Sequence, residues 1–141
     1  MIARHATEPD SPAILALYRA LAGETPVGSA TNLRAVLAHP GTEILVVEDA
    51  DIVVSMATLS LIPNVTHQGR PYGVIENVVT LPTHQRRGFG RVVMQAAIDT
   101  AWQANAYKVM LMTGRANSTK GFYEALGFDS TEKWSMILRH P

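Results

Sequence analysis

The chain has 141 residues, with 12 Lys and Arg against 12 Asp and Glu, and it contains no cysteine. This length suits one compact domain, which we expect to span residues 1–141. A net charge of zero provides no field that would hold a nucleic acid or attract a basic peptide, so we expect no nucleic-acid partner. The lack of cysteine excludes a disulfide framework, a thiolate metal site and a cysteine nucleophile, and it fits a reducing compartment.

The sequence shows no targeting or membrane-spanning signal. Its first residues, MIARHATEPD, lack the basic start and apolar stretch of a secretory signal. No apolar run approaches the ~20 residues of a membrane span. We therefore expect a cytoplasmic protein with no membrane partner.

The first part of the chain predicts one strand followed by two helices. Met1–Ala6 is a strand candidate. A helix then follows Asp10-Ser11-Pro12, which offers an N-cap and a first-turn proline, and Gly23 is placed to end it. Thr31 is positioned to cap a second, shorter helix through Leu37.

Three strands are expected next. Glu43–Glu48 and Ile52–Leu61 are rich in β-branched and aliphatic residues and flank Asp49-Ala50-Asp51, which predicts a hairpin. A polar loop, Pro63–Pro71, separates this hairpin from the apolar run Tyr72–Thr80.

The second half of the chain predicts two helices and two strands. A long helix runs from about Gly88 to near Asn105, and the strand Tyr107–Thr113 follows it. A short helix spans about Ser118–Leu126, and Phe128–Leu138 closes the chain as a strand. The order β-α-α-β-β-β-α-β-α-β predicts an α/β fold with a mixed sheet, because parallel neighbours must be joined by helical crossovers.

The segment Leu81–Arg91, between an apolar strand and the long helix, has the features of an anion site. Unpaired N–H groups at a helix N-terminus attract anions, glycines let an anion approach the backbone, and arginines add positive charge. The residues concerned are Gly88, Gly90, Arg86, Arg87 and Arg91. By themselves, the glycines also fit an ordinary turn, and the arginines also fit a solvated helix start.

Two common phosphate motifs do not fit this loop. It lacks the Gly-Lys-Ser/Thr of a Walker loop, and Val93 stands where a dinucleotide fingerprint has its third glycine. Gln85–Gly90 instead resembles the Q/R-x-x-G-x-G/A pyrophosphate loop of the GNAT superfamily of acetyl-CoA-dependent N-acetyltransferases. Ile75–Pro82 resembles the fourth strand of that superfamily, and Asn117–Phe128 resembles its N-x-x-x-x-F-Y-x-x-x-G-F segment. The resemblance covers about Gly73–Phe128, and the rest of the chain matches only in the order of its elements.

The resemblance implies that acetyl-CoA is bound as a co-substrate, and the sequence itself offers no pattern of metal ligands, so we expect no metal. The end of the fourth strand would pair with the pantetheine arm, which enters through a splay between this strand and Tyr107–Thr113. Asn117 would contact the cofactor from the next loop, although an N-cap role fits it equally well. The cofactor-binding residues implied in this way are Val78, Val79, Thr80, Gln85, Arg86, Arg87, Gly88, Phe89, Gly90, Arg91 and Asn117.

Tyr123 is the candidate general acid. Attack of an amine on a thioester releases a thiolate, and a phenol with a pKa near ~10 is a suitable proton donor to it. The alternative is an aromatic side chain that packs at the edge of the domain.

Glu76 is the candidate general base. It is a carboxylate within an apolar strand, and an acceptor amine arrives mostly as ammonium, so a base must take its proton directly or through water. The alternative is a carboxylate that accepts hydrogen bonds and fixes the strand. The neighbouring Asn77 cannot act as a base and is expected to position a group. The five histidines are dispersed and do not predict a metal site, and His67–Arg70 either borders the acceptor pocket or is a solvated loop.

The resulting hypothesis is an enzyme that transfers acetyl from acetyl-CoA to a primary amine of a small molecule, by direct attack in a ternary complex. The alternatives are a non-catalytic acyl-CoA-binding module and a protein lysine or N-terminal acetyltransferase. The chain resembles small single-domain members such as the glucosamine-6-phosphate N-acetyltransferases, but these usually have Asp where this chain has Asn77, so the acceptor stays open. The resemblance also implies a homodimer, to which the last strand, Phe128–Leu138, could offer an edge.

Overall fold

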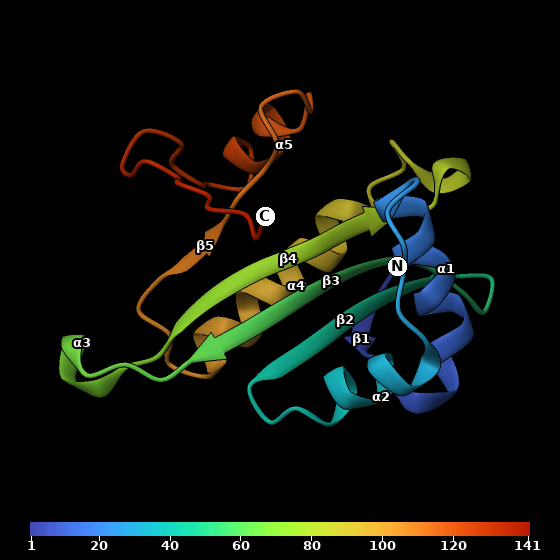
Figure 1. Ribbon diagram of the computed structural model, residues 1–141, viewed down its shortest axis with the longest axis horizontal. Coiled ribbons are helices and arrows are strands. Elements are labelled where there is room, and N and C mark those ends of the chain that lie inside the picture. The colour runs from blue at the N-terminus through green and yellow to red at the C-terminus, as the bar shows by residue number, and fades with distance from the viewer. The chain divides into compact units, whose positions relative to one another are not determined.

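The computed structural model describes residues 1–141, which form two compact units: unit 1, Met1–Met110, and unit 2, Leu111–Pro141. Unit 1 is built on a β-sheet with helices on both of its faces (Figure 1). No helix in the chain combines the length and the hydrophobicity needed to cross a bilayer.

The sheet has the strand order β1-β2-β3-β4-β5, and its first four strands pair antiparallel. The predicted hairpin is confirmed: β2 and β3 are joined by a tight turn in which Ala50 and Asp51 have left-handed φ angles of 49° and 64°. The strands are β1 Ala3–His5, β2 Thr42–Asp49, β3 Ile52–Ile62, β4 Tyr72–Thr80 and β5 Val109–Leu111.

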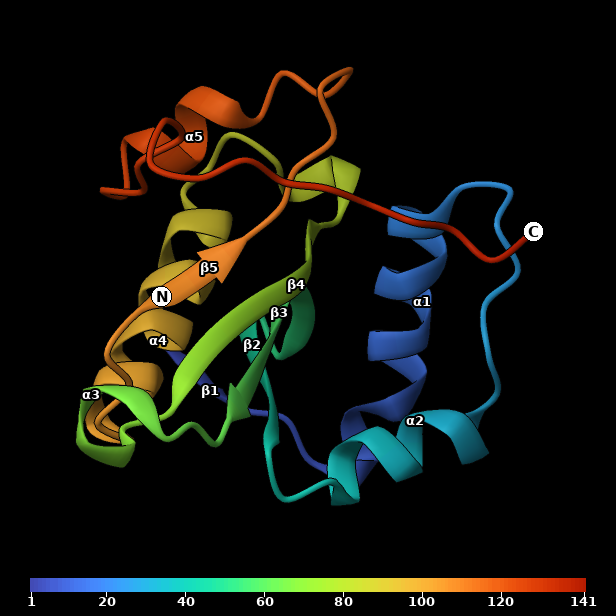
Figure 2. The same ribbon diagram turned by 60° about the vertical axis from the view of Figure 1, so that its left-hand side comes forward.

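Helices α1 and α2 lie on one face of the sheet, and α4 lies on the other (Figure 2). The helices of unit 1 are α1 Ser11–Ala22, α2 Ala30–Ala38, α3 Thr66–Gly69 and α4 Phe89–Gln103, with short 3-10 turns η1 Glu8–Asp10 and η2 Pro82–His84. As predicted, Asp10 is the N-cap residue of α1 and Gly23 follows its last turn. The cap predicted for α2 is wrong by two residues, because Ser29 and Asn32 form a capping box that starts this helix earlier than Thr31.

The core of unit 1 has two layers, one on each side of the sheet. On the first side, α1 and α2 pack against the strands through Ile14, Leu17, Leu33, Ile44, Val46, Met56 and Val79. On the other, α4 buries Phe89, Val93, Met94, Ala97, Ile98 and Ala101. These residues hold the end of β4 and the start of α4 in place, and the candidate site is built on them.

Unit 2 contains one short helix, α5 Lys120–Glu124, within the predicted range of Ser118–Leu126. Gly127 lies just beyond it with a left-handed φ of 95°, a conformation common in a glycine that ends a helix. The strand predicted over Phe128–Leu138 is wrong, because no strand follows α5. Trp134 and Leu138 of this segment are 84% and 99% exposed, and backbone without a neighbouring strand cannot form a ladder.

Candidate active site

The start of α4 has no hydrogen bond from a capping side chain. Gly88 is its N-cap residue, with a left-handed φ of 91° that glycine adopts without steric penalty. The first-turn N–H groups, at Phe89, Gly90 and Arg91, have no carbonyl partner within the helix. The predicted boundary between loop and helix is therefore confirmed, and it presents N–H groups suited to an anion.

The polar side chains of the loop divide into two kinds. Gln85 Nε2 donates to the carbonyl of Thr80 at 3.2 Å, and Arg87 Nη2 donates to Asp49 Oδ2 at 2.8 Å. Arg86 and Arg91 are exposed and make no hydrogen bond or ion pair within the chain. Gln85 and Arg87 thus tether the loop, while the other two arginines are available to a bound anion.

Phe89 can serve a ligand only through its backbone. Its side chain is 2% exposed and contacts the ring of His84 edge-on, with ring centroids 5.8 Å apart. The guanidinium of Arg87 lies 5.1 Å from the centre of the same ring. The side chain of Phe89 is therefore part of the core at the base of the loop.

β4 contains a bulge that the apolar pattern of the strand does not predict. Met56 pairs with Val79 and Thr58 pairs with Glu76, so β4 has one residue more than β3 between these two pairs. Asn77 lies in this interval with a left-handed φ of 54°. Asparagine tolerates this conformation better than the β-branched residues around it, and an asparagine within such a run was the available signal.

The bulge places Glu76 on the α1 side of the sheet. Directly paired residues of antiparallel strands point to the same face. Val79 belongs to the core beneath α1 and α2, and Thr58, the partner of Glu76, has its hydroxyl 3.5 Å from that of Tyr18 on α1. In a regular strand two residues three positions apart would point to opposite faces.

The Glu76 side chain is exposed and makes no hydrogen bond or ion pair within the chain. The alternative in which its carboxylate fixes the strand through hydrogen bonds is therefore wrong. Its role as a base stays a prediction. The hydroxyls of Tyr18 and Thr58 flank this side of the strand.

The end of β4 is fastened to β3 by side chains as well as by the ladder. Ser55 Oγ donates to the carbonyl of Val79 at 3.1 Å and lies 2.8 Å from Thr80 Oγ1. At the other end of β4, the N–H of Gly73 donates to the carbonyl of Lys108 at 2.9 Å. The pairing of Val78, Val79 and Thr80 with a pantetheine arm, and the splay that admits it, stay predictions.

Unit 2 carries the two remaining candidates. Tyr123 lies on α5, where its ring contacts Phe122 and Phe128 edge-on at 5.1 and 6.3 Å. The N-cap residue of α5 is Thr119, so the alternative in which Asn117 caps this helix is wrong. Glu76 belongs to unit 1 and Tyr123 to unit 2, and their convergence on one thioester stays a prediction.

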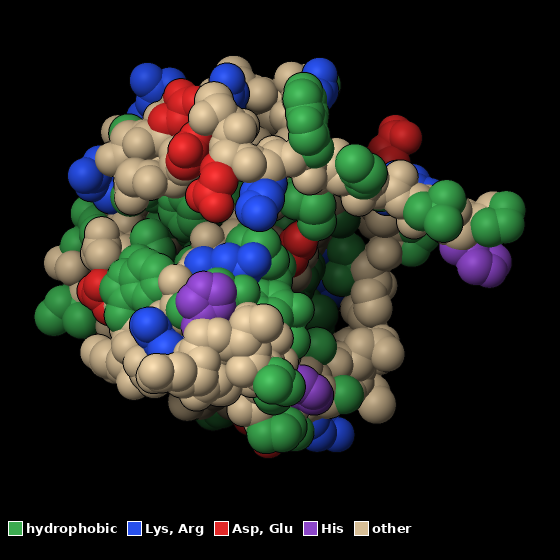
Figure 3. Space-filling model, turned by 90° about the vertical axis from the view of Figure 1, so that its left-hand side faces the viewer, with side chains coloured by type: hydrophobic (Ala, Val, Ile, Leu, Met, Phe, Trp, Pro, Cys, Tyr) green, Lys and Arg blue, Asp and Glu red, His purple; other side chains and the backbone are tan.

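The loop around α3 lies at the start of β4, at the opposite end of that strand from Gln85–Arg91. The ring of His67 stacks on Tyr107 at 3.7 Å, and Arg70 Nη2 donates to the carbonyl of Ala106 at 3.1 Å. In Figure 3, which looks toward this end of unit 1, a histidine lies among basic and hydrophobic side chains. The loop is thus tied to the turn after α4, while residues 65–69 are exposed to solvent.

Comparison with known proteins gives one consistent family. A model of the acetyltransferase (GNAT) family matches residues 7–128. Glucosamine 6-phosphate N-acetyltransferase of Schizosaccharomyces pombe is 36% identical over 91 residues, which cover 63% of this chain and 80% of that protein. The protein of the same name from Trypanosoma brucei brucei is 32% identical over 81 residues, 57% of this chain and 54% of that protein. A solved structure from Agrobacterium tumefaciens strain C58, described as a candidate acetyltransferase, has a TM-score of 0.91 at 40% identity and covers 99% of this chain and 100% of its own.

Proposed function

The chain belongs to the acetyltransferase (GNAT) family and is an acyltransferase, and we propose that it moves acetyl from acetyl-CoA to a primary amine of a small molecule. The observation that carries this proposal is the uncapped start of α4 with Arg86 and Arg91 unpaired beside it. N–H groups and two free cations in one place suit a pyrophosphate. Gln85–Arg91 would hold that group, the backbone of Val78–Thr80 would pair with the pantetheine arm, and Asn117 would contact the cofactor.

Glu76 and Tyr123 would supply the proton transfers. Bound acetyl-CoA supplies an acetyl group activated as a thioester. Glu76 accepts a proton from the ammonium of the acceptor, directly or through water, and leaves an amine lone pair free to attack. As the tetrahedral adduct collapses, the Tyr123 hydroxyl donates a proton to the departing thiolate, and the nitrogen releases its second proton, which restores the phenol directly or through water. The products are an amide and CoA thiol. Direct attack requires both substrates to be bound together, and the chain has no cysteine to carry the acetyl group as a thioester.

The α1 side of the sheet is the proposed place of the acceptor. The exposed Glu76 carboxylate lies there across from Thr58 and near the hydroxyl of Tyr18. An unpaired carboxylate attracts an ammonium, and neighbouring hydroxyls orient it. Glucosamine 6-phosphate is the first acceptor to test, because the two curated relatives are named for it. Asn77 departs from the residue usual in those enzymes, so the screen includes unphosphorylated amines.

The experiment is a panel of primary amines incubated with acetyl-CoA, with release of the CoA thiol followed by a thiol reagent. Amino sugars, amino sugar phosphates, polyamines, amino acids and a lysine peptide represent the acceptor classes. We expect sustained thiol release with at least one small amine and only slow hydrolysis without one. Activity confined to the lysine peptide would contradict the proposed acceptor class. Tight binding of acetyl-CoA without turnover of any amine would favour an acyl-CoA-binding module.

We also propose that the protein is cytoplasmic and forms a homodimer. The exposed apolar side chains of Trp134, Met136 and Ile137 support an association of two copies.

A further inference from the structure

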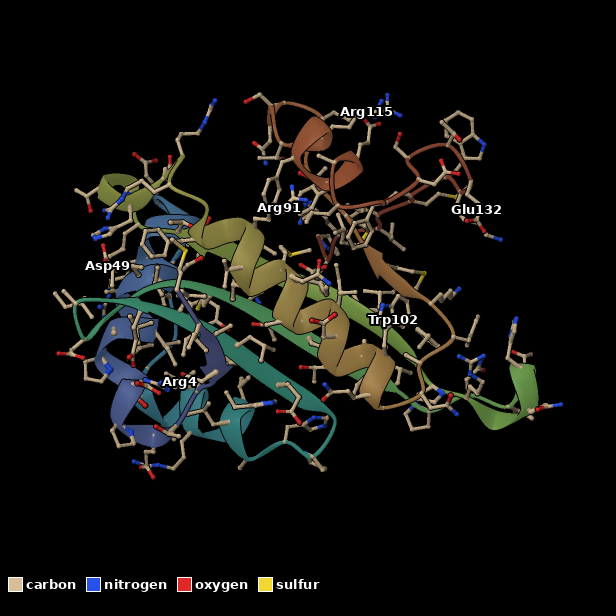
Figure 4. All side chains as sticks on the ribbon, turned by 180° about the vertical axis from the view of Figure 1, so that it is seen from behind. Arg4, Asp49, Arg91, Trp102, Arg115 and Glu132 are labelled. Atoms are coloured by element: carbon tan, nitrogen blue, oxygen red, sulfur yellow. The ribbon has the colours of Figure 1, made fainter.

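Asp49 is the last residue of β2 and lies beside the candidate cofactor loop. Ala50 and Asp51 make the tight turn, and Asp49 pairs with Ile52 across it. The start of the loop is fixed to the same hairpin, because the N–H of Leu81 donates to the carbonyl of Val54 at 2.8 Å. Figure 4 shows Asp49 at the β2–β3 turn and Arg91 at a separate place along α4.

One carboxylate oxygen of Asp49 faces two cationic or polar groups of the loop. Arg87 Nη2 donates to Asp49 Oδ2 at 2.8 Å, and His84 Nε2 lies 3.6 Å from the same oxygen. The other ring nitrogen of His84, Nδ1, is 2.8 Å from the hydroxyl of Thr83. When that hydroxyl donates to Nδ1, the proton of a neutral His84 lies on Nε2, toward Asp49.

An aromatic ring completes the contact from the core side. The guanidinium of Arg87 lies 5.1 Å from the centre of the Phe89 ring, and Phe89 is buried in the first turn of α4. Arg87 is therefore held by a carboxylate and by a ring at once, an arrangement that its planar guanidinium suits. Because Phe89 is the first residue of α4, the contact of Arg87 with its ring links Asp49 to the helix turn that presents the N–H groups.

The other arginines of this segment have no such partner. Arg86 and Arg91 are unpaired, and Asp49 makes the one ion pair between a carboxylate and the arginines of the loop. Before an anion binds, three neighbouring arginines repel one another, and the left-handed φ of 62° at Arg86 adds backbone strain. A fixed carboxylate offsets this repulsion in the free protein.

We propose that Asp49 is a positioning residue for acetyl-CoA binding: it holds Arg87 against Phe89, fixes the loop and the first turn of α4, and leaves Arg86 and Arg91 for the phosphates. The proposal rests on the function proposed above. It also changes the role of Arg87, for which the family resemblance implies a direct contact with the cofactor. In this arrangement Arg87 supports the loop from behind.

The direction in which an Asp49 substitution changes the dissociation constant of CoA distinguishes a positioning role from simple charge repulsion. A carboxylate near an anion site repels the anion, so removing its charge should tighten the binding of CoA. Loss of a positioning contact should weaken that binding instead. An exposed ion pair contributes little to folding stability, so Asp49→Asn should leave the fold intact.

The experiment compares Asp49→Asn with Asp51→Asn in the full chain. Asp51 lies in the same turn, is exposed, and makes no ion pair, so its variant controls for the change in charge. Titration calorimetry with CoA at one fixed ionic strength gives the dissociation constants. We expect Asp49→Asn to raise the Kd roughly fivefold or more, an effect in the range of a lost charge-assisted contact, and Asp51→Asn to leave it unchanged or lower it. An unchanged or lower Kd in Asp49→Asn overturns the proposal.

A double-substitution cycle tests whether Arg87 acts through Asp49. Arg87→Gln should weaken CoA binding in the wild-type background and have little further effect in Asp49→Asn. Arg91→Gln should weaken binding by a similar factor in both backgrounds, because that side chain is unpaired. Equal losses from Arg87→Gln in both backgrounds would make Arg87 an independent ligand and exclude the proposed role of Asp49.

A measurement on the free protein separates this proposal from the proposed function. The N–H of Val92 donates to the carbonyl of Gly88 at 3.1 Å, so its hydrogen exchange reports whether the loop and the helix start stay together. We expect exchange at Val92 to be several-fold faster in Asp49→Asn than in the wild type, with Asp51→Asn unaffected. If the N–H of Val92 exchanges at the same rate in all three proteins, Asp49 does not position the loop, even if CoA binds. If wild-type protein binds no CoA, the proposed function fails, and the exchange rates still decide whether Asp49 fixes the loop.

Discussion

Glu76→Gln is the substitution that tests the base at the scale of one residue. Glutamine keeps the size of the side chain but cannot accept a proton from the acceptor. We expect kcat to fall by a factor of about 10²–10⁴, because this is the range that a positioned base contributes, while the Kd of acetyl-CoA stays unchanged. Steady-state kinetics with an acceptor from the amine panel provides the test. Glu24→Gln is the control, since Glu24 is also exposed and unpaired, and equal kcat in both variants would exclude Glu76 as the base.

Tyr123→Phe tests the acid in the same way. The ring and its contacts with Phe122 and Phe128 remain, and only the hydroxyl is lost. We expect kcat to fall by about 10²–10⁴ with little change in cofactor affinity, because the proton is needed only as the thiolate departs. Tyr72→Phe is the matched control. Turnover near the wild-type rate would leave solvent or another group as the proton donor.

At this scale the sequence predicted residue types better than their roles. Gly88 and the arginines around it were found because their chemistry is local to the loop. The partner of Arg87 was missed because Asp49 lies 38 positions away and meets it only through the hairpin. The exposure of Glu76 was missed because it depends on the bulge at Asn77, which breaks the alternation of the strand.

Gly90→Val tests the first turn of α4 as an element that binds phosphate. A β-branched side chain at Gly90 would occupy the space that the pyrophosphate needs, and valine is tolerated in a helix at least as well as glycine. We expect the variant to fold, with an unchanged circular dichroism spectrum, and to show no measurable binding of acetyl-CoA by calorimetry. Gln95→Val, on the exposed side of the same helix, should bind normally. A folded Gly90→Val protein with wild-type affinity would exclude this turn as the phosphate site.

The junction of β1 and η1 predicts a pH-dependent term in stability. Arg4 bonds both carboxylate oxygens of Asp10, at 2.8 Å each, and also contacts Glu48, and the hydrogen bonds from Arg4 lower the pKa of Asp10 from 3.8 to about 2. A carboxylate with a lowered pKa stabilises the fold above its unfolded pKa, and this contribution is lost as the pH falls from about 3.8 through about 2. Arg4 is labelled in Figure 4.

The test is urea unfolding of the wild type and of Asp10→Asn at several pH values. We expect the wild type to be more stable by about 1–2 kcal/mol at pH ~6, after allowance for solvent around Arg4, and this difference to shrink below pH ~3. Asp51→Asn should show no such trend. A difference that does not vary with pH would mean that Asp10 acts through packing and not through its charge.

The helices and strands that have capping or turn residues at their ends, and one buried face, were predicted well. α1 lies between Asp10 and Gly23, and β4 was predicted with its observed bounds, Tyr72–Thr80. The strand expected over Phe128–Leu138 was wrong, because a strand depends on a neighbour that no local pattern specifies. The α2 start was missed because Ser29 and Asn32 satisfy each other and outcompete Thr31 as a cap.

At the scale of the whole molecule, a net charge of zero conceals how the charges are used. Several cations are occupied within the chain: Arg4 by Asp10, Arg34 by Glu8, and Arg87 by Asp49. Arg86 and Arg91 have no such partner, and both lie beside the uncapped start of α4. Composition could not show this, because pairing is a property of the folded chain. The chain divides into two compact units, and the expectation that residues 1–141 form one domain stays a prediction.

Thermal unfolding with and without acetyl-CoA is the most direct test that this chain uses the cofactor of its family. A ligand that binds only the folded state adds RT ln(1 + [L]/Kd) to stability, about 2.7 kcal/mol at a hundredfold excess over Kd. For a chain of this length we expect a rise in Tm of roughly 5–15 °C at millimolar acetyl-CoA, and none for the Gly90→Val variant. Calorimetric titration of the wild type should show a matching heat of binding. An unchanged Tm together with no heat of binding would contradict acetyl-CoA as the co-substrate.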